Sequence, residues 1–421
     1  MHWFRSISER FLLLLMAVIY FIERSKEPAL GDALSFSVAA LEGFDISTNA
    51  TNHFLYLNVL HLVSLFTGFN GSHLAFQMFS LIPSLFCLFM LSIVLKQLSV
   101  KLEIRILTLL LLGFSFTFWR HAEIIEVYTL NLSFTSLVVF WFIKWHQKRE
   151  KRYLYQSAFI LGLAMTVHVQ QLLYIPFLLY WGYLAFSFKA KFWIRYLFSF
   201  VIPSSILFII PLFYDTNTLG SVLFDNSFQD EVLDLSVKMI LRGTLKSLAL
   251  LFFNFGPLAL LFIIAAFKPK VKKSLHWGLF TLGFVVYGFA ARYNVSDNHV
   301  FFLPAYFVLL IFFAIYANGF LTKNRTRILI SFGLVMGVPL FYLVAPSIVS
   351  KTSFGDEMNT SKFYKGGTRF FFYPGMRVNN GGLYLGKSLK EETISTDLNL
   401  EIEQNADNAI KYLERCQKAH D

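Results

Sequence analysis

Long apolar runs alternate with short polar segments along most of the chain. In the longest runs the apolar residues surround the whole helix instead of following one face, as in Leu81–Leu95, Phe198–Phe213 and Leu248–Phe267. Runs of ~15 to 22 residues are long enough to cross much of the hydrocarbon layer of a bilayer. The pattern therefore predicts an all-α polytopic membrane protein.

The number and spacing of these runs predict about eleven transmembrane helices within residues 1–345. The first run, Phe11–Ile22, is followed by no small-residue cleavage site, so we expect it to remain as the first helix. The positive-inside rule assigns the basic segments to the cytoplasm together with Arg5 and Arg10. These segments are HQKREKR (146–152), KPKVKK (268–273) and TKNRTR (322–327).

The polar residues 346–421 are predicted to form a small extracytoplasmic C-terminal region that follows a membrane domain of residues 1–345. Within this region Arg369–Tyr373 is typical of a short strand, and Leu398–Cys416 is typical of a helix. The N-terminus is then cytoplasmic and the C-terminus extracytoplasmic. We expect an integral protein of the bacterial inner membrane.

Composition agrees with this class: 56% of the residues are hydrophobic, 18% are aromatic, and the mean hydropathy is +0.56. The net charge of +11 is explained by cytoplasmic loops and lipid headgroups, without a nucleic-acid partner. Cys87 and Cys416 lie at different predicted depths, which argues against a disulfide between them. The sequence contains no Walker, GxGxxG or HExxH motif, which argues against a nucleotide-driven pump and a zinc protease.

The strongest chemical signal is the stretch FWRHAEIIEVYTLN, which runs from Phe118 to Asn131. Each of its charges would cost ~3 kcal/mol at the centre of a bilayer, so the stretch should lie in a pocket or at a membrane edge. If it is helical, Glu123 and Glu126 share one face with Trp119 and Leu130 and point together into a cavity. The alternative is a short polar loop between two transmembrane helices.

Three other places carry polar residues beside apolar runs. Asp32 follows Gly31 and precedes an amphipathic run, so it is either a helix N-cap or a general base at the membrane surface. His168, with Gln170 and Gln171, interrupts an apolar stretch as interfacial residues or as hydrogen-bond donors to a phosphate or sugar. Arg292 and Asp297, with His299, either form an ion pair in an outer turn or let the arginine bind a lipid phosphate.

Together these residues resemble the protein O-mannosyltransferase-like family, whose members are C-type glycosyltransferases that use polyprenyl-phosphate sugars as donors. The resemblance rests on Gly31-Asp32, Phe118–Asn131, Gly162–His168 and Tyr293–Ala305. It implies a C-type glycosyltransferase fold for about the first 345 residues. The family shows a glutamate soon after the aspartate of the first loop, whereas this chain continues with Ala33-Leu34.

The resulting hypothesis is an inverting membrane glycosyltransferase. It moves a sugar, with mannose as one candidate, from a polyprenyl-phosphate donor to a hydroxyl of a protein or glycan at the outer face. Asp32 is the predicted catalytic base. The predicted substrate-binding residues are Arg120, His121, Glu123, Glu126, Tyr128, His168, Gln171, Arg292 and Asp297.

Arg120 or Arg292 would stabilise the departing phosphate together with His121 and His168. Two alternatives stay open, namely a transporter or lipid flippase, and a catalytically silent assembly partner. Metal independence is the favoured expectation because the sequence shows no dense acidic cage. The alternative is that Asp32, Glu123 and Glu126 converge on one Mg²⁺ or Mn²⁺ ion.

Overall fold

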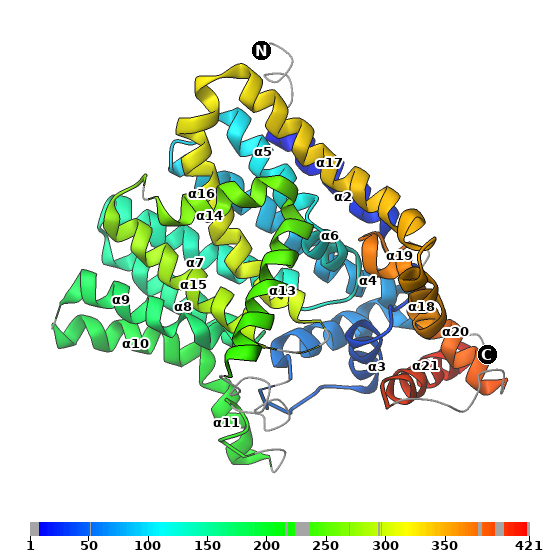
Figure 1. The fold of residues 1–421 in the computed structure, drawn as a ribbon. Coiled ribbons are helices and arrows are strands. Elements are labelled where there is room, and N and C mark those ends of the chain that lie inside the picture. The colour runs from blue at the N-terminus through cyan, green and yellow to red at the C-terminus, as the bar shows by residue number, and fades with distance from the viewer. Residues whose placement is uncertain are drawn as a thin grey trace.

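The computed structural model describes residues 8–50, 52–187, 189–214, 218–223, 236–268, 270–293, 295, 297–377, 381–391 and 400–418. All the regular secondary structure in these ranges is helical, which confirms the predicted all-α class (Figure 1). Arg5, which contributed to the predicted orientation of the N-terminus, lies outside the described residues.

The first part of the chain forms ten α-helices within the described ranges. They are α2 (Glu9–Glu23), α3 (Asp32–Glu42), α4 (Phe54–Gln97), α5 (Leu102–Gly113), α6 (Phe116–Glu123), α7 (Tyr128–Lys148), α8 (Lys151–Met165), α9 (Ile175–Phe186), α10 (Ala190–Ser204) and α11 (Ile206–Phe213). The short 3₁₀ helix η1 (Val169–Tyr174) joins α8 to α9.

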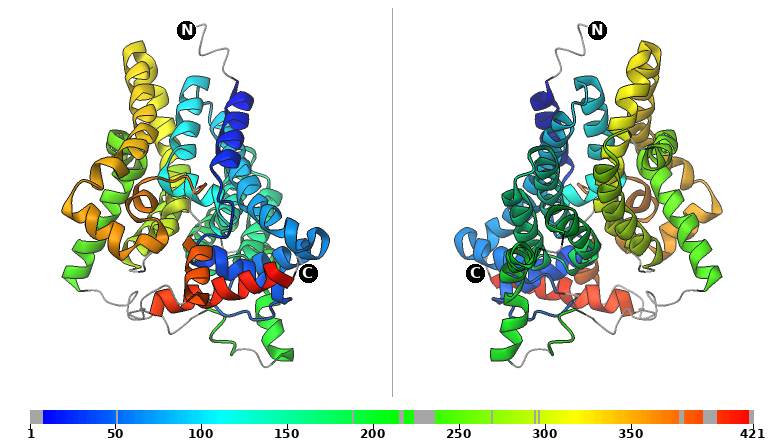
Figure 2. Two further views of the ribbon diagram at one scale, coloured as in Figure 1. Left: turned by 90° about the vertical axis from the view of Figure 1, so that its right-hand side faces the viewer. Right: turned by 90° about the vertical axis from the view of Figure 1, so that its left-hand side faces the viewer.

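The second part continues with α13 (Val237–Phe255), η3 (Gly256–Leu258), α14 (Ala259–Phe267), α15 (Lys273–Arg292), η4 (Asn298–Phe302), α16 (Leu303–Phe320), η5 (Leu321–Lys323) and α17 (Arg325–Val349). The C-terminal region contains α18 (Ser353–Ser361), η6 (Phe363–Lys365), α19 (Gly367–Phe372), α20 (Gly381–Lys390) and α21 (Leu400–Lys418). In Figures 1 and 2, α2 begins at the end of the molecule where α16 and α17 meet, and α3, α20 and α21 lie at the other end.

The prediction of about eleven transmembrane helices is not confirmed. Among the described residues, five helical segments are long and apolar enough to cross a membrane: Phe54–Gln97, Val237–Phe267, Lys273–Arg292, Asn298–Lys323 and Arg325–Val349. Two bent pairs, α5 with α6 (65°) and α10 with α11 (50°), raise this number to seven if each pair is one broken span. Other predicted spans correspond to shorter helices, such as α2 with 15 residues and α9 with 12 residues.

Helix α4 is divided into two parts by a break at Gly68. Gly68 has φ 64° and ψ 177°, a conformation that glycine adopts at little cost. Before the break, His61 of α4 bonds to the Ala40 carbonyl of α3 at 2.8 Å. After it, the Ser80 carbonyl accepts a hydrogen bond from Thr129 of α7 at 2.9 Å.

The core is centred on α16, which is surrounded by α4, α5, α7, α14 and α15. Most of its side chains are fully buried, including Tyr306 and Phe313. Close approach between neighbouring helices depends on small residues. At Gly278 of α15, an added Cβ atom would lie 1.6 Å from the Trp181 ring of α9.

Gly278→Ala is therefore expected to lower the free energy of unfolding by about 3 kcal/mol, because overpacking forces a large buried ring to move. Gly288→Ala on the same helix is the matched control, since a Cβ atom there meets no described atom within 4 Å. Thermal unfolding of the two purified variants in detergent measures the difference. Equal stability of both variants would contradict the tight contact between α9 and α15.

The predicted strand Arg369–Tyr373 is wrong, because most of these residues lie in α19. The carbonyl groups at the C-terminal end of this short helix bind the guanidinium group of Arg120, a residue far away in the sequence. A cation at this end also complements the helix dipole. The predicted helix Leu398–Cys416 is confirmed from residue 400 onward as α21, and residues 398–399 lie outside the described ranges.

Candidate active site

The stretch from Phe118 to Asn131 is not one helix. Helix α6 ends at Glu123, Ile124 has extended backbone angles, and α7 begins at Tyr128. The hydroxyl group of Ser80 on α4 bonds to both the amide and the carbonyl of Glu126 at 3.0 Å, which replaces helical hydrogen bonds. The prediction of a shared helix face for Glu123 and Glu126 is therefore wrong. The alternative of a short polar loop is correct for residues 124–127.

Arg120 and Glu123 both face the C-terminal region. Arg120 donates hydrogen bonds to the carbonyl groups of Phe370 and Tyr373, the second at 2.8 Å. Glu123 accepts a hydrogen bond from the amide of Met376 at 3.0 Å and another from the Trp119 indole. Both side chains are buried. We call these contacts the Arg120–Glu123 joint, and they occupy two side chains that the sequence assigned to substrate.

Glu126 points to a different group of residues, which we call the acidic cluster: Asp32, Glu126 and Asp297. Asp32 is the first residue of α3 and Gly31 is its N-cap, so the N-cap interpretation of Asp32 is wrong. The Asp32 side chain is accessible to solvent although protein surrounds it on most sides. This enclosure, and then the nearby Asp297 carboxylate, raise the pKa of Asp32 to about 6.

Burial also raises the pKa of Glu126 well above its usual value, and the charges of Asp32 and Asp297 add to this effect. One carboxyl oxygen of Glu126 is buried without a hydrogen-bond partner among the described residues. An unpaired buried oxygen of this kind costs ~1 to 3 kcal/mol unless a ligand or water binds it. The acidic cluster therefore combines an accessible carboxyl group with a buried one that can bind a polar ligand.

Asp297 lies between negative and positive groups. The Tyr128 hydroxyl donates a long hydrogen bond of 3.5 Å to it, and burial raises the pKa of Asp297. The ammonium groups of Lys365 in η6 and Lys246 in α13 lie near enough to offset part of this rise. The sequence analysis missed both lysines. Lys246 could have been found as a charge inside an apolar run, whereas nothing around Lys365 signals a site.

Arg292 ends α15 five positions before Asp297 in the sequence. Its Nε and Nη2 atoms are buried and have no hydrogen-bond partner within the part of the chain that the structure describes. An ion pair with Asp297 therefore does not supply partners for these two nitrogen atoms. Two free N–H groups of an arginine are suited to a phosphate or carboxylate.

Two histidines with unpaired nitrogen atoms lie beside the acidic cluster. The rings of His121 and His299 are 5.7 Å apart, and His121 also packs 5.3 Å from the Tyr128 ring. Within the described ranges, both ring nitrogen atoms of His121 are buried without a hydrogen-bond partner, and so is the Nε2 atom of His299. These nitrogen atoms are available to hydroxyl or phosphate oxygens. His299 was noticed in the sequence but was not selected as a site residue.

His168 and Gln171 lie behind Tyr128. The His168 ring is 5.6 Å from Tyr128 and 4.8 Å from His53, and its Nδ1 atom accepts a hydrogen bond from the Gln170 amide. Gln171 donates hydrogen bonds to Asn131 and, at 3.3 Å, to the Thr135 hydroxyl. His168 is therefore placed beside the site, whereas Gln171 chiefly holds η1 against α7.

The predicted convergence of Asp32, Glu123 and Glu126 on one metal ion does not occur, because Glu123 belongs to the Arg120–Glu123 joint. Throughout the described ranges, no group of three or more His, Cys, Asp or Glu side chains has an arrangement that could hold a metal ion.

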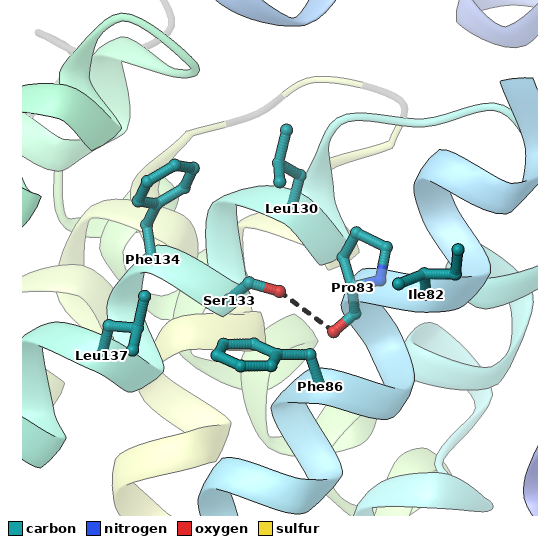
Figure 3. Close-up of a pocket in the computed structure, with 7 residues that line it drawn as sticks. All are labelled: Ile82, Pro83, Phe86, Leu130, Ser133, Phe134 and Leu137. Carbon is teal, nitrogen blue, oxygen red and sulfur yellow. Dashed lines mark hydrogen bonds between the residues drawn. The ribbon is translucent and has the colours of Figure 1, made fainter.

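An apolar groove runs between α4 and α7 (Figure 3). Its volume is about 260 Å³, and it is lined by Ile82, Pro83, Phe86, Leu130, Ser133, Phe134 and Leu137. The one hydroxyl group in this lining, that of Ser133, donates to the Pro83 carbonyl at 3.0 Å, as Figure 3 shows. The surface that remains suits a hydrocarbon chain.

Residues 44–187 match the family model of the protein O-mannosyl-transferase TMEM260 N-terminal domain. The resemblance to the protein O-mannosyltransferase-like family is confirmed. The matched segment contains the loop 124–127, Tyr128 and His168, and it ends before Lys246 and Asp297. Asp32 precedes it. A comparison with curated proteins finds no match.

The fold is similar to that of ArnT from Cupriavidus metallidurans. The apo crystal structure has a TM-score of 0.61 and 12% identity, and the match covers 96% of this chain and 74% of that one. The crystal structure of the same protein bound to undecaprenyl phosphate gives 0.61 and 11%, with 96% and 75% covered. At such low identity the similarity establishes an ArnT-like fold. The apolar helices and this fold support an integral membrane protein.

Proposed function

We propose that this protein transfers a sugar from a polyprenyl-phosphate donor to an acceptor hydroxyl group at the outer face of a membrane. The observation that carries the proposal is the position of Asp32. It is an accessible carboxyl group with a pKa raised to about 6, and it lies in a cluster with unpaired hydrogen-bonding groups nearby. A general base works best when its pKa lies near the operating pH.

In the proposed reaction, Asp32 accepts the proton of the acceptor hydroxyl while the oxygen attacks the anomeric carbon of the sugar. A new carbon–oxygen bond forms as the bond between the sugar and the phosphate breaks. The lipid phosphate leaves with the bonding electron pair, and Asp32 holds the proton. Because attack and departure take place on opposite faces, the configuration at the anomeric carbon inverts.

Positive charge is needed where the phosphate departs. Arg292 is the better of the two predicted arginines. Its Nε and Nη2 atoms are both unpaired among the described residues, whereas Arg120 has only its Nε unpaired and donates from Nη2 to two carbonyl groups. Lys246 and Lys365 add positive charge on the side of Asp297. The unpaired nitrogen atoms of His121 and the buried oxygen of Glu126 would bind sugar hydroxyl groups.

The apolar groove of Figure 3 would accommodate part of the polyprenyl chain. Leu130 in its lining lies in the first turn of α7, which begins with Tyr128. In this arrangement the lipid stays in the membrane and the sugar extends into the acidic cluster. Mannose and a protein acceptor are the candidates suggested by the name of the matching family.

A donor panel tests the class of reaction. Purified protein in liposomes is given mannose and other labelled sugars as polyprenyl phosphates, as polyprenyl diphosphates and as nucleotide sugars, with hydroxyl-bearing peptides or glycans as acceptors. Transfer is expected only from a polyprenyl-phosphate sugar, with inversion at the anomeric carbon as read by NMR. Transfer from nucleotide sugars alone, or retention of configuration, would refute the proposal.

A further inference from the structure

Helix α21 of the C-terminal region packs along α3, the helix that begins with Asp32 (Figures 1 and 2). An apolar seam joins the two helices to α20, with Leu34, Val38, Leu383, Ala409 and Tyr412 buried in it. Polar contacts accompany the seam along its length. The last of them are the hydrogen bond from Arg415 to the Leu41 carbonyl at 2.9 Å and its ion pair with Glu42 at 3.6 Å.

At the other end of the seam, Asn405 contacts the start of α3. Its side-chain oxygen accepts a hydrogen bond of 2.7 Å from the backbone amide of Gly31. One turn further on, Asn408 donates a hydrogen bond of 3.0 Å to the Ser35 hydroxyl. These two asparagines therefore hold successive turns of α3, and the first of them acts next to Asp32.

The Gly31 contact supplies a hydrogen bond that α3 cannot make for itself. In a capping box, the third residue of a helix is a Glu or Gln whose side chain accepts from the amide of the N-cap residue. Here the N-cap is Gly31 and the third residue is Leu34, which has no acceptor. Gly31 also has a φ angle of 93°, which side-chain-bearing residues rarely adopt. Asn405 fixes this unusual backbone from a different helix.

We propose that Asn405 is a positioning residue for Asp32, so that the site is incomplete without α21. This inference rests on the proposed role of Asp32 as the base. Gly31 directly precedes Asp32, so a hydrogen bond that holds the Gly31 backbone in its unusual conformation restrains the direction in which the Asp32 side chain leaves the start of α3. A base that is misplaced by ~1 Å can lose about a hundredfold in rate. The C-terminal region thereby acts on the chemistry without contacting substrate.

The test compares Asn405→Ala with Asn408→Ala, which removes the same side chain from the next turn of the same helix. Asn405→Ala is expected to lower kcat about tenfold and to leave KM within about twofold. Asn408→Ala should keep kcat within about twofold of the wild type. Both variants are made in the full-length protein, and thermal unfolding confirms that they fold.

A double-mutant cycle separates positioning from general damage. If Asn405 acts through Asp32, Asn405→Ala should not reduce the residual activity of Asp32→Asn any further. Equal loss of kcat in the two asparagine variants, or a further tenfold loss in the Asp32→Asn background, would overturn the proposal.

Hydrogen exchange provides a readout that does not depend on turnover. Amides 31–35 should exchange at least tenfold faster in Asn405→Ala than in the wild type, and unchanged exchange would also overturn the proposal. If the wild-type protein transfers no sugar from any donor, the proposed function fails. The exchange result then still decides whether Asn405 fixes the start of α3.

Discussion

Replacing Asp32 with asparagine is expected to lower kcat for sugar transfer at least about a hundredfold, because the amide has the same shape but cannot accept the acceptor's proton. KM for the lipid donor should change little, since Asp32 is assigned to the acceptor. The measurement is transfer of labelled sugar at matched protein concentration. Asp356→Asn is the control, because this exposed carboxylate of α18 lies outside the acidic cluster.

The same account predicts how the wild-type activity depends on pH. A base must be deprotonated, so kcat/KM should fall as the pH drops through about 6, the value to which the surrounding protein and Asp297 raise the pKa of Asp32. Asp297→Asn removes one negative neighbour and should move this acid limb to lower pH. Glu126, the other carboxyl group facing Asp32, remains in that variant. An acid limb that does not move would contradict the coupling between Asp32 and Asp297.

Replacing Arg120 with methionine is expected to release residues 363–376 from the helices around Arg120. The guanidinium group bonds to two carbonyl groups and lies over the Phe116 and Phe370 rings at 4.3 Å and 4.5 Å. Losing charged hydrogen bonds and leaving buried carbonyl groups unpaired should cost about 3 kcal/mol of local stability. Hydrogen exchange of residues 363–376 should accelerate about a hundredfold, and transfer activity should fall because Lys365 is displaced.

Arg369→Met is the matched control for this prediction. Arg369 lies on α19 itself, is exposed, and its guanidinium group contacts the Tyr373 ring at 5.0 Å. Its loss should leave exchange within about threefold of the wild type. If Arg120→Met also leaves residues 363–376 protected, then the Arg120–Glu123 joint does not hold the C-terminal region.

The sequence predicted the membrane class because composition and apolar runs depend on local residues alone. A shared helix face for Glu123 and Glu126 was one of two interpretations, because their spacing fits a helix, and a short polar loop was the other. The structure interrupts that helix where Ser80, from a different helix, takes over the backbone hydrogen bonds of Glu126. The strand predicted at Arg369–Tyr373 failed for the same reason, since Arg120 stabilises the end of α19 from a distance. Neither partner can be read from local spacing.

Only part of the candidate site could likewise be predicted from the sequence. Asp32, Glu126 and Asp297 were selected from the sequence, and the structure brings them together although they come from three separate segments. Arg120 and Glu123 were selected by the same reasoning about charges in apolar surroundings. Both instead form hydrogen bonds with backbone groups of the C-terminal region. A charged residue within an apolar stretch indicates that some group binds it, but only the fold shows whether that group is a ligand or another part of the chain.

The measurement that tests the central claim most directly follows both halves of one donor molecule. Purified wild-type protein in liposomes receives a polyprenyl-phosphate sugar labelled separately in the sugar and in the lipid, together with an acceptor. The account predicts that the sugar label moves to the acceptor while an equal amount of lipid phosphate is released, and that Asp32→Asn abolishes both. Movement of the intact, doubly labelled donor to the opposite leaflet without release of lipid phosphate would contradict the account and indicate a flippase.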